Sequence, residues 1–374
     1  MSGLPQIPGY TIQDVIAAGG QGVVARGLDP RGRPVALKFL LDERPSAGKR
    51  FRQETRVLRA LQHPNLVQAY ESGQAEGVSW LAMEQIKGQS LFELVEAHGL
   101  PTTARIGALL ATLAHALDYC HAQGLVHRDL KPENVLIERG SGRCVLVDFG
   151  LVKRDAERMH LATLDEGGPL SLSGTVKGTP GYMAPEQIDP QGFAGVSPQT
   201  DVYALGGLLY YLLCGEAPFR GKVPAVVMRK VLKRPAPDPR QIAPQAAPAL
   251  AALSMACLAK DPAARPPGAK AFAAAVAQAA GIPPVPAPPA RAPQGVEVLG
   301  PEELLEETQH PATSAPPGGR FAPGQRFAGL EILRPLARGG GGRLRRADRG
   351  GRGGRAQGPP QQPGRRLRPR ALLA

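Results

Sequence analysis

Within residues 127–134, HRDLKPEN, an aspartate, a lysine and an asparagine follow one another at short spacing. The carboxylate of Asp129 could accept a hydrogen bond from a hydroxyl group and orient it for in-line attack. Lys131 could neutralise charge on a phosphoryl group, and Asn134 could offer an amide oxygen to Mg²⁺, a hard ion that prefers oxygen ligands. A plain helix-to-strand turn is the alternative interpretation. The combination favours a site of group transfer.

A further candidate ligand, Asp148, lies near the end of the segment VLVDFG at residues 145–150. A buried strand that ends in an aspartate would project the carboxylate towards a metal ion that bridges phosphates. The tripeptide DFG is common by itself, but at this distance after residues 127–134 it is specific. The two segments together predict a site for a metal and a phosphorylated substrate.

A glycine-rich stretch, IAAGGQGVV at residues 16–24, lies between two strand candidates. Glycines at the tip of a hairpin let the backbone approach phosphates and offer its N–H groups to their charge. Lys38 follows in VALK, where a lysine among apolar strand residues needs an anionic partner. Glu54, on the next helix candidate, is the expected carboxylate partner of Lys38, whereas Glu43 is too close to the strand end to reach back.

In this order the segments match the signature of protein kinases. The chain resembles the bacterial Hanks-type serine/threonine protein kinases from about Tyr10 to Ala280, and the lysine two residues after Asp129 resembles Ser/Thr rather than tyrosine kinases. It departs from the glycine-loop pattern at Ala17, where the family has its first glycine. The resemblance implies Asp129, Lys131 and Lys38 as catalytic residues, and Asn134 and Asp148 as metal ligands. It implies these ATP-binding residues: Ile16, Ala17, Gly19, Gly22, Val24, Ala36, Lys38, Glu54, the gatekeeper Met83 and the first hinge residue Glu84.

The resemblance also implies an activation segment that closes with GTPGYMAPEQ at residues 178–187. Thr179 would shape the acceptor pocket, Glu186 would pair with Arg265, and Asp201 would brace the catalytic loop. Kinases with an arginine before the catalytic aspartate, here Arg128, often need a phosphate on this segment. The spacing to GTP makes Thr175 the first candidate phosphosite and Ser173 the second.

Periodic apolar segments give the expected architecture. Residues 10–84 are rich in strand candidates with one helix candidate at 47–62, and residues 88–280 are mainly helical, with long apolar helices at 102–124 and 199–215. We therefore predict an α+β bilobal protein-kinase fold: a kinase domain at 10–280, with a small β-rich N-lobe at about 10–84 and a larger helical C-lobe at about 88–280.

Composition changes after residue 280. Residues 281–326 begin with six prolines in 13 residues and are expected to be a largely disordered linker. Residues 327–342 resemble the start of a second kinase N-lobe, because 329–342 repeats 9–22 at a constant offset of 320, with four coinciding glycines. Residues 343–374 form an Arg/Gly/Pro-rich tail that is either the product of a frameshift or a genuine nucleic-acid-binding tail.

Charge and cysteine content limit the other function classes. Of the net charge of +13, +9 lies in residues 343–374, so the high pI alone indicates no nucleic-acid function. Four scattered cysteines indicate neither disulfides nor a zinc site, and the longest strongly apolar run, 202–215, is short of the ~20 residues that cross a bilayer. We expect a cytoplasmic enzyme without a membrane or nucleic-acid partner.

The predicted function is transfer of the γ-phosphoryl group of ATP to Ser/Thr hydroxyls of protein substrates, with Mg²⁺, or alternatively Mn²⁺, as cofactor. Autophosphorylation in the activation segment, through self-association, is expected too. The alternative is a pseudokinase or scaffold that signals by binding. All five residues that separate the two classes are present: Lys38, Glu54, Asp129, Asn134 and Asp148.

Overall fold

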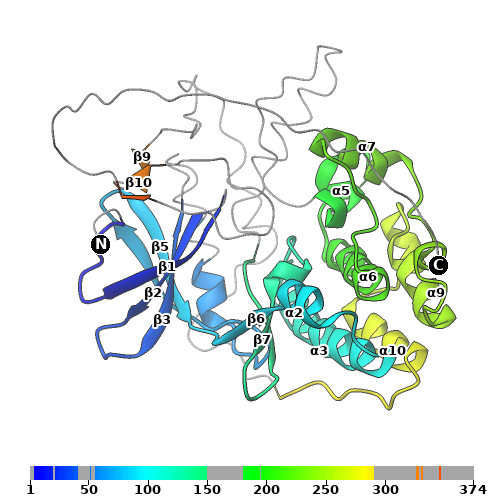
Figure 1. Ribbon diagram of the computed structural model, residues 1–374, viewed down its shortest axis with the longest axis horizontal. Helices are drawn as coiled ribbons and strands as arrows, with labels where there is room; N and C mark the ends of the chain where they lie inside the picture. The colour runs from blue at the N-terminus through cyan, green and yellow to red at the C-terminus, as the bar shows by residue number, and fades with distance from the viewer. Residues whose placement is uncertain are drawn as a thin grey trace, which may run out of the picture.

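The computed structural model describes residues 4–19, 22–40, 51, 55–149, 180–193 and 195–289, together with the backbone of three short strands near the C-terminus. A five-stranded antiparallel sheet forms one lobe and a group of helices forms the other (Figure 1). The prediction of an α+β bilobal kinase fold is confirmed. The sheet has the order β1-β2-β3-β5-β4, with β1 Thr11–Gly19, β2 Gly22–Leu28, β3 Pro34–Leu40, β4 Ala69–Ala75 and β5 Val78–Glu84.

The central strand β3 separates two apolar faces because successive side chains of a strand point to opposite sides. Val35, Leu37 and Phe39 pack in a core on one face of the sheet, with Trp80 of β5. Ala36 belongs instead to the large core that continues into the helical lobe. Lys38 alternates with the first set, so it shares the Ala36 face and lies opposite Val24 and Leu81.

The helical lobe is built around helix α6, whose sequence is apolar along nearly its whole length. Helix α6 is buried along almost its whole length and packs on α3 and α9. The helices are α2 (Leu91–His98), α3 (Thr103–Ala122), α5 (Pro185–Ile188), α6 (Pro198–Cys214), α7 (Pro224–Lys233), α8 (Pro239–Ile242), α9 (Pro248–Cys257) and α10 (Ala269–Ala279), with 3₁₀ turns at Pro132–Asn134, Pro180–Tyr182 and Pro262–Ala264. Cys120, Cys144, Cys214 and Cys257 are all free thiols.

A small sheet joins the two lobes next to the catalytic segments. It consists of β6 (Gly88–Ser90), β7 (Val135–Glu138) and β8 (Cys144–Leu146). The backbone N–H of Leu146 donates to the carbonyl of Asn65 at 2.8 Å, and Val67 N–H donates to the carbonyl of Leu146 at 3.0 Å. The sequence of residues 65–73, NLVQAYESG, predicts a single strand, but residues 65–67 pair with β8 and β4 begins only at Ala69.

The first nine residues of the predicted linker, 281–289, are described and lie beside the helical lobe. Ile282, Val285 and Pro288 are half-buried, whereas the residues between them are exposed. This repeat of three is the period of a polyproline II helix that rests on one of its edges. A ring nitrogen of His115 on α3, Nε2, lies 2.8 Å from the carbonyl oxygen of Val285.

Three two-residue strands lie near the C-terminus, β9 (Arg326–Phe327), β10 (Leu330–Glu331) and β11 (Arg345–Arg346). β10 pairs antiparallel with both others, and Glu331 lies opposite Arg345. In the first hairpin Thr11, the counterpart of Glu331, pairs with Leu28, the counterpart of residue 348. The two hairpins therefore share their direction but differ in register.

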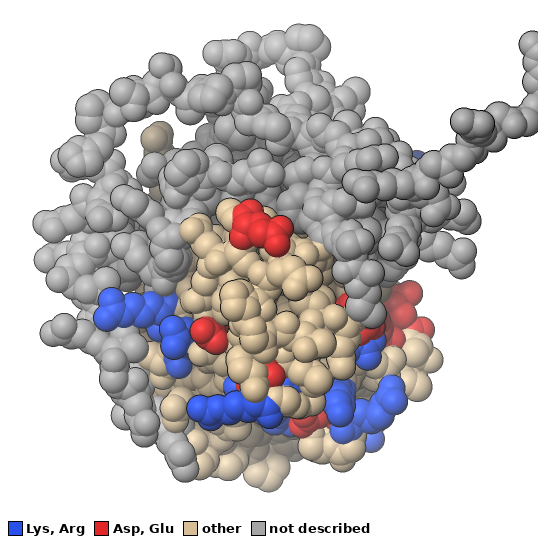
Figure 2. All heavy atoms as spheres, turned by 90° about the vertical axis from the view of Figure 1, so that its left-hand side faces the viewer, with Lys and Arg blue, Asp and Glu red and all other residues tan. Residues whose placement is uncertain are grey.

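The described surface carries mixed charge. On the face of the molecule shown in Figure 2, the centre is mostly uncharged, and Lys and Arg side chains are interspersed with Asp and Glu near the lower edge. None of the helices in the described part of the chain is long and apolar enough to span a bilayer.

Candidate active site

Asp129 is held in a network of short-range contacts. Its side chain is buried, and the Asn134 amide Nδ2 donates to the Asp129 carbonyl at 2.7 Å and to its carboxylate Oδ2 at 3.1 Å. Lys131 Nζ lies 3.3 Å from the same Oδ2. Burial lowers the pKa of Lys131, but the charges of Asp129 and Glu133 outweigh it and raise the pKa. The three residues singled out in 127–134 therefore form one cluster, with Lys131 charged.

Asp201 supports this cluster from the N-terminal turn of α6. Its fully buried carboxylate accepts hydrogen bonds from the backbone N–H groups of His127 (2.8 Å) and Arg128 (2.9 Å), and His121 Nε2 lies 2.7 Å away. Burial raises the pKa of Asp201, but the contacts with His121 and His127 outweigh it, and the pKa lies below its usual value. An ionised carboxylate therefore orients the backbone just before Asp129.

Two residues next to the reactive groups have left-handed backbone conformations. Arg128 has φ 65° and Asp148 has φ 60°, a region that side chains other than glycine seldom adopt. Such strain persists only where neighbouring contacts hold it. Gln187 Nε2 donates to the carbonyl of Arg128 at 2.8 Å, and the buried ring of His127 packs at a tilt against Phe149, with 4.6 Å between centroids. Contacts from α5 and between the two loops therefore hold these backbone conformations.

Lys38 and Asp148 are in direct contact. Lys38 Nζ forms a short ion pair with Asp148 Oδ1, and their side chains are 10% and 32% exposed. Lys38 and Asp148 come from different lobes, 110 positions apart in the sequence. The contact shows that the β3 lysine reaches the segment that ends β8.

The donor set at this place fits a hard divalent cation. Asp148 supplies a partly exposed carboxylate, and Asn134 uses its Nδ2 on Asp129, which leaves the amide oxygen Oδ1 as the atom that could ligate a cation. The described residues contain no group of three or more His, Cys, Asp or Glu that could hold a metal by themselves. A cation here would need further oxygen ligands from a substrate or from water.

The expected nucleotide-binding residues surround the sheet face above these groups. Ala36 and Met83 are buried on one core with Val24 packed against it, whereas Ile16 on β1 is 46% exposed. Gly22 pairs with Gly19 at the hairpin tip, and a Cβ on Gly22 would lie 2.1 Å from the carbonyl oxygen of Phe39. Close approach to β3 therefore already requires glycine at residue 22.

Glu186 and Arg265 form a buried bidentate ion pair, with nitrogen–oxygen distances of 2.6 and 2.8 Å. Thr200 Oγ1 also donates to Glu186, at 2.9 Å. The third nitrogen of the Arg265 guanidinium, Nε, donates to the carbonyl of Ala259 at 2.9 Å, and Nη1 and Nη2 also donate to backbone carbonyls. The pair fixes the end of the activation segment to α6 and to the turn before α10.

Several predicted residues lie outside the described part of the chain: Glu54, Ser173, Thr175 and Thr179. Sequence reasoning also missed two supporting residues, His121 and Gln187. His121, in the last turn of α3, contacts the Asp201 carboxylate, and Gln187, in α5, donates to the carbonyl of Arg128. Both contacts arise only through the tertiary fold. No local pattern distinguishes either from an ordinary helix residue.

Comparisons with known proteins agree with this geometry. The family model described as "Protein kinase domain" matches residues 10–276. Over 226 residues the chain is 39% identical to the serine/threonine-protein kinase PknJ of Mycobacterium tuberculosis, which covers 59% of this chain and 36% of that protein. It is 35% identical over 259 residues to the DNA damage-responsive serine/threonine-protein kinase RqkA of Deinococcus radiodurans, covering 66% of this chain and 37% of that protein.

Among solved structures, the kinase domain of PknI from Mycobacterium tuberculosis superposes with a TM-score of 0.58 at 26% identity, covering 75% of this chain and 98% of that one. The matched region thus spans little more than a third of the PknJ and RqkA chains but nearly the whole PknI kinase domain. The five-stranded sheet, the site and the helical lobe up to the last three residues of α10 lie within residues 10–276, which the family model matches. The chain belongs to the protein kinase domain family.

Proposed function

We propose that this protein transfers the γ-phosphoryl group of ATP to serine or threonine hydroxyls of proteins. The observation that carries the proposal is the cluster of Asp129, Lys131 and Asn134 beside the Lys38–Asp148 pair. This cluster contains a proton acceptor, two cations and two oxygen ligands. Similarity to curated serine/threonine kinases supports the same reaction class.

Each residue of the site has its own role in the proposed phosphoryl transfer. Asp129 accepts a hydrogen bond from the acceptor hydroxyl and orients its oxygen towards the γ-phosphorus. A new oxygen–phosphorus bond forms, the bond to the β-phosphate oxygen breaks, ADP leaves, and the hydroxyl proton passes through Asp129 to solvent. Lys131 neutralises the transferring group and Lys38 the remaining phosphates. Asp148 and Asn134 would hold Mg²⁺, or Mn²⁺, and the cation would supply positive charge that offsets the charge of the phosphates.

Incorporation of labelled phosphate from ATP into a generic basic protein tests this function. Asp129→Asn should lower the rate at least about 100-fold, because the proton acceptor is lost, while binding of a fluorescent ATP analogue persists. Asp118→Asn on α3 is the matched control, with the same chemical change away from the cluster. Nucleotide binding without incorporation above the Asp129→Asn level, with either cation, would support the pseudokinase alternative.

We further propose autophosphorylation at Thr175, or at Ser173, as the activating modification. A phosphate on either residue would be expected to pair with Arg128, whose backbone is already fixed by Asp201 and Gln187. The Thr175→Ala, Ser173→Ala double variant should incorporate less phosphate and lose activity. Full activity with unchanged incorporation would contradict the proposal.

For the C-terminal region we propose a remnant of a second kinase N-lobe at 327–342. The repeat of 9–22 and the antiparallel pairing of β10 with β11 support it, although the register differs from that of β1 and β2. Kinase-like sequence in an adjacent reading frame of the transcript would establish a frameshift after this remnant. Salt-dependent RNA binding that deletion of residues 343–374 abolishes would instead establish a nucleic-acid-binding tail.

A further inference from the structure

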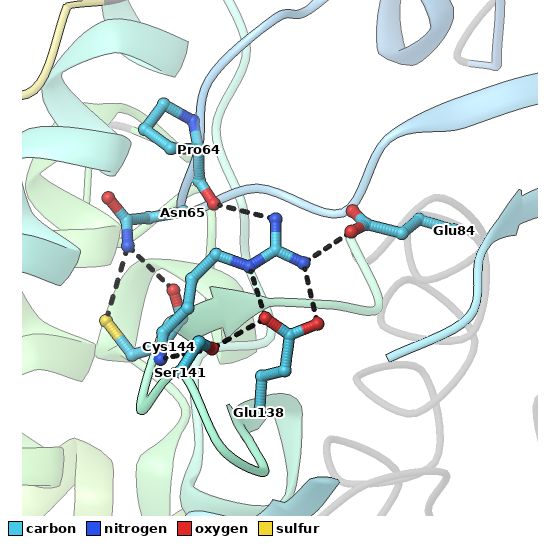
Figure 3. Close-up of polar contacts among 7 residues, drawn as sticks. Pro64, Asn65, Glu84, Glu138, Ser141 and Cys144 are labelled. Atoms are coloured by element: carbon cyan, nitrogen blue, oxygen red, sulfur yellow. Dashed lines mark hydrogen bonds and ion pairs between the residues drawn. The ribbon is translucent and has the colours of Figure 1, made fainter. Parts of the chain in front are cut away.

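Arg143, which the sequence did not single out, lies in the turn that joins β7 to β8 behind the start of the hinge. Its Nη2 forms a short ion pair with Glu84, the last residue of β5. Its Nε lies 3.2 Å from Glu138 Oε2 on β7, and its Nη1 donates to the carbonyl of Pro64 at 3.4 Å. Figure 3 shows the Glu84 and Glu138 carboxylates and the Pro64 carbonyl converging on one guanidinium.

These contacts are partly shielded from water. The side chains of Arg143, Glu84 and Glu138 are 28%, 23% and 27% exposed. Burial lowers the pKa of Arg143, but the hydrogen bonds and charges of Glu84 and Glu138 outweigh it and raise the pKa. A planar guanidinium with several charged partners fixes their relative positions better than a single exposed ion pair does.

Each partner of Arg143 belongs to a different part of the site. Glu84 begins the hinge, and its N–H donates to the carbonyl of Gln68 at 2.8 Å. Pro64 lies in the loop before β4. Residues 65–67 of the same loop are hydrogen-bonded to β8. Glu138 is the last residue of β7 and also accepts a hydrogen bond from Ser141 Oγ at 2.7 Å.

The hairpin that carries Arg143 also carries the two candidate metal ligands at its open end. β7 starts at Val135, directly after Asn134, and β8 stops at Leu146, two residues before Asp148. Arg143 is therefore near the turn of the hairpin that positions both ligands, and it holds the first hinge residue from there. One side chain connects the expected adenine site with the phosphate and metal site.

We propose that Arg143 is a positioning residue that sets the hinge relative to Asn134 and Asp148 and so preorganises the site for nucleotide. The proposal rests on the proposed kinase function and deepens it. Without the guanidinium, Glu84 and Glu138 would each lose the ion-pair partner described for them, and Glu138 would keep the hydrogen bond from Ser141. The hinge would then be held to the hairpin less firmly, and nucleotide would have to order it on binding.

The test measures the dissociation constant of a fluorescent ATP analogue with Mg²⁺, and kcat and KM for ATP, in full-length variants. Arg143→Met should raise the dissociation constant and KM about 3- to 10-fold, as expected for loss of a partly buried charged contact, with kcat within about 2-fold. Arg143→Lys should give an intermediate dissociation constant and KM, because an ammonium group cannot contact several partners as the planar guanidinium does. Arg139→Met is the matched control, since it removes an exposed arginine from the same turn.

Thermal unfolding is recorded for every variant. If Arg143→Met folds poorly, Glu84→Gln still tests the contact, because it weakens the same ion pair from the other side. The double variant should bind nucleotide no more weakly than the weaker single variant, because both changes remove one interaction. Additive effects would overturn the proposal, as would a dissociation constant for Arg143→Met and Glu84→Gln within 2-fold of the unsubstituted protein. A higher kcat at unchanged affinity would also overturn it, because the contact would then oppose closure.

The binding measurement separates this proposal from the kinase function. If the unsubstituted protein binds the analogue but transfers no phosphate, the kinase proposal fails, whereas the dissociation constants of the variants still decide the role of Arg143. If transfer occurs and Arg143→Met binds nucleotide normally, only the positioning role fails.

Discussion

Asp201 and Asp148 show how burial and hydrogen bonding assign different roles to the same side chain. Asp201 is fully buried, and its carboxylate oxygens contact His121 and accept hydrogen bonds from two backbone N–H groups. It therefore holds the loop at His127 and Arg128 in place. The Asp148 side chain is 32% exposed and contacts Lys38 across the two lobes, which agrees with its predicted role as a metal ligand. Sequence spacing singled out both aspartates, and their surroundings separate the two roles.

The buried side chain of His63 should make the stability of the protein depend on pH. Its Nδ1 accepts a hydrogen bond from the backbone N–H of Asn65 at 3.1 Å, so the ring is neutral with its proton on Nε2. Burial, with a smaller contribution from the charge of His115, lowers the pKa of His63 to about 4. The unfolded chain, with a pKa of about 6.5, therefore binds a proton that the folded protein does not.

The free energy of unfolding should accordingly be highest above pH 6.5 and fall between about pH 6.5 and 4, by about 1 to 2 kcal/mol for this residue. Urea titrations at several pH values would measure it against His63→Gln, which keeps an acceptor but cannot titrate. Equal slopes for the two proteins over this range would show that His63 does not contribute.

At the scale of elements, helix packing explains two adjacent glycines in α6. A Cβ at Gly206 would lie 2.4 Å from the Cβ of Cys257 on α9, whereas one at Gly207 would have its nearest contact, Tyr182 Cδ1, at 3.2 Å. Ser254 Oγ also donates to the carbonyl of Gly206 at 3.0 Å. The crossing of α6 and α9 therefore depends on the first glycine rather than on the second.

Gly206→Ala should destabilise the protein by about 1 to 3 kcal/mol through overpacking, although alanine is the better helix former by about 1 kcal/mol. Gly207→Ala is the neighbouring control and should lower the free energy of unfolding by less than Gly206→Ala, or leave it unchanged. Chemical denaturation would measure both variants, and the same loss in both would mean that the close approach to α9 is not the cause.

At the scale of the whole molecule, residues 281–289 extend the folded unit beyond the family match, which ends at residue 276. The segment leaves α10 close to α3, where a Cβ on Gly107 would lie 2.4 Å from Ala280 Cβ and 3.2 Å from Ile282 Cδ1. It reaches the rear of the hinge, where Pro289 lines a hollow of about 280 Å³ together with Glu84 and Arg143. The chain therefore continues towards its C-terminus from the hinge rather than from the last helix.

Val285→Asp should release this segment, because it places a charge on the half-buried edge that packs against the core. We expect a loss of about 1 to 2 kcal/mol in the free energy of unfolding and faster proteolysis between residues 281 and 289. Ala287→Asp, on the exposed side of the same segment, should change neither. Identical behaviour of the two variants would contradict docking through Val285.

The sequence by itself determined the kinase family and the fold of two lobes, and it predicted the reactive residues. Asp129, Lys131, Asn134 and Asp148 lie in short contiguous segments, because the chemistry needs them at fixed spacing along a loop and a strand end. The apolar residues around Lys38 were enough to place it on a strand, β3. These features are local, so local patterns predict them.

The tertiary structure decided which distant groups complete the site. His121 on α3 supports the Asp201 carboxylate, Gln187 on α5 donates to the carbonyl of Arg128, and Arg143 meets Glu84 across 59 positions of the sequence. The docking of residues 281–289 depends likewise on the shape of the α3 surface, although their composition alone predicted a linker. Such contacts arise from packing between elements, and packing leaves no periodic signal in the segments that meet.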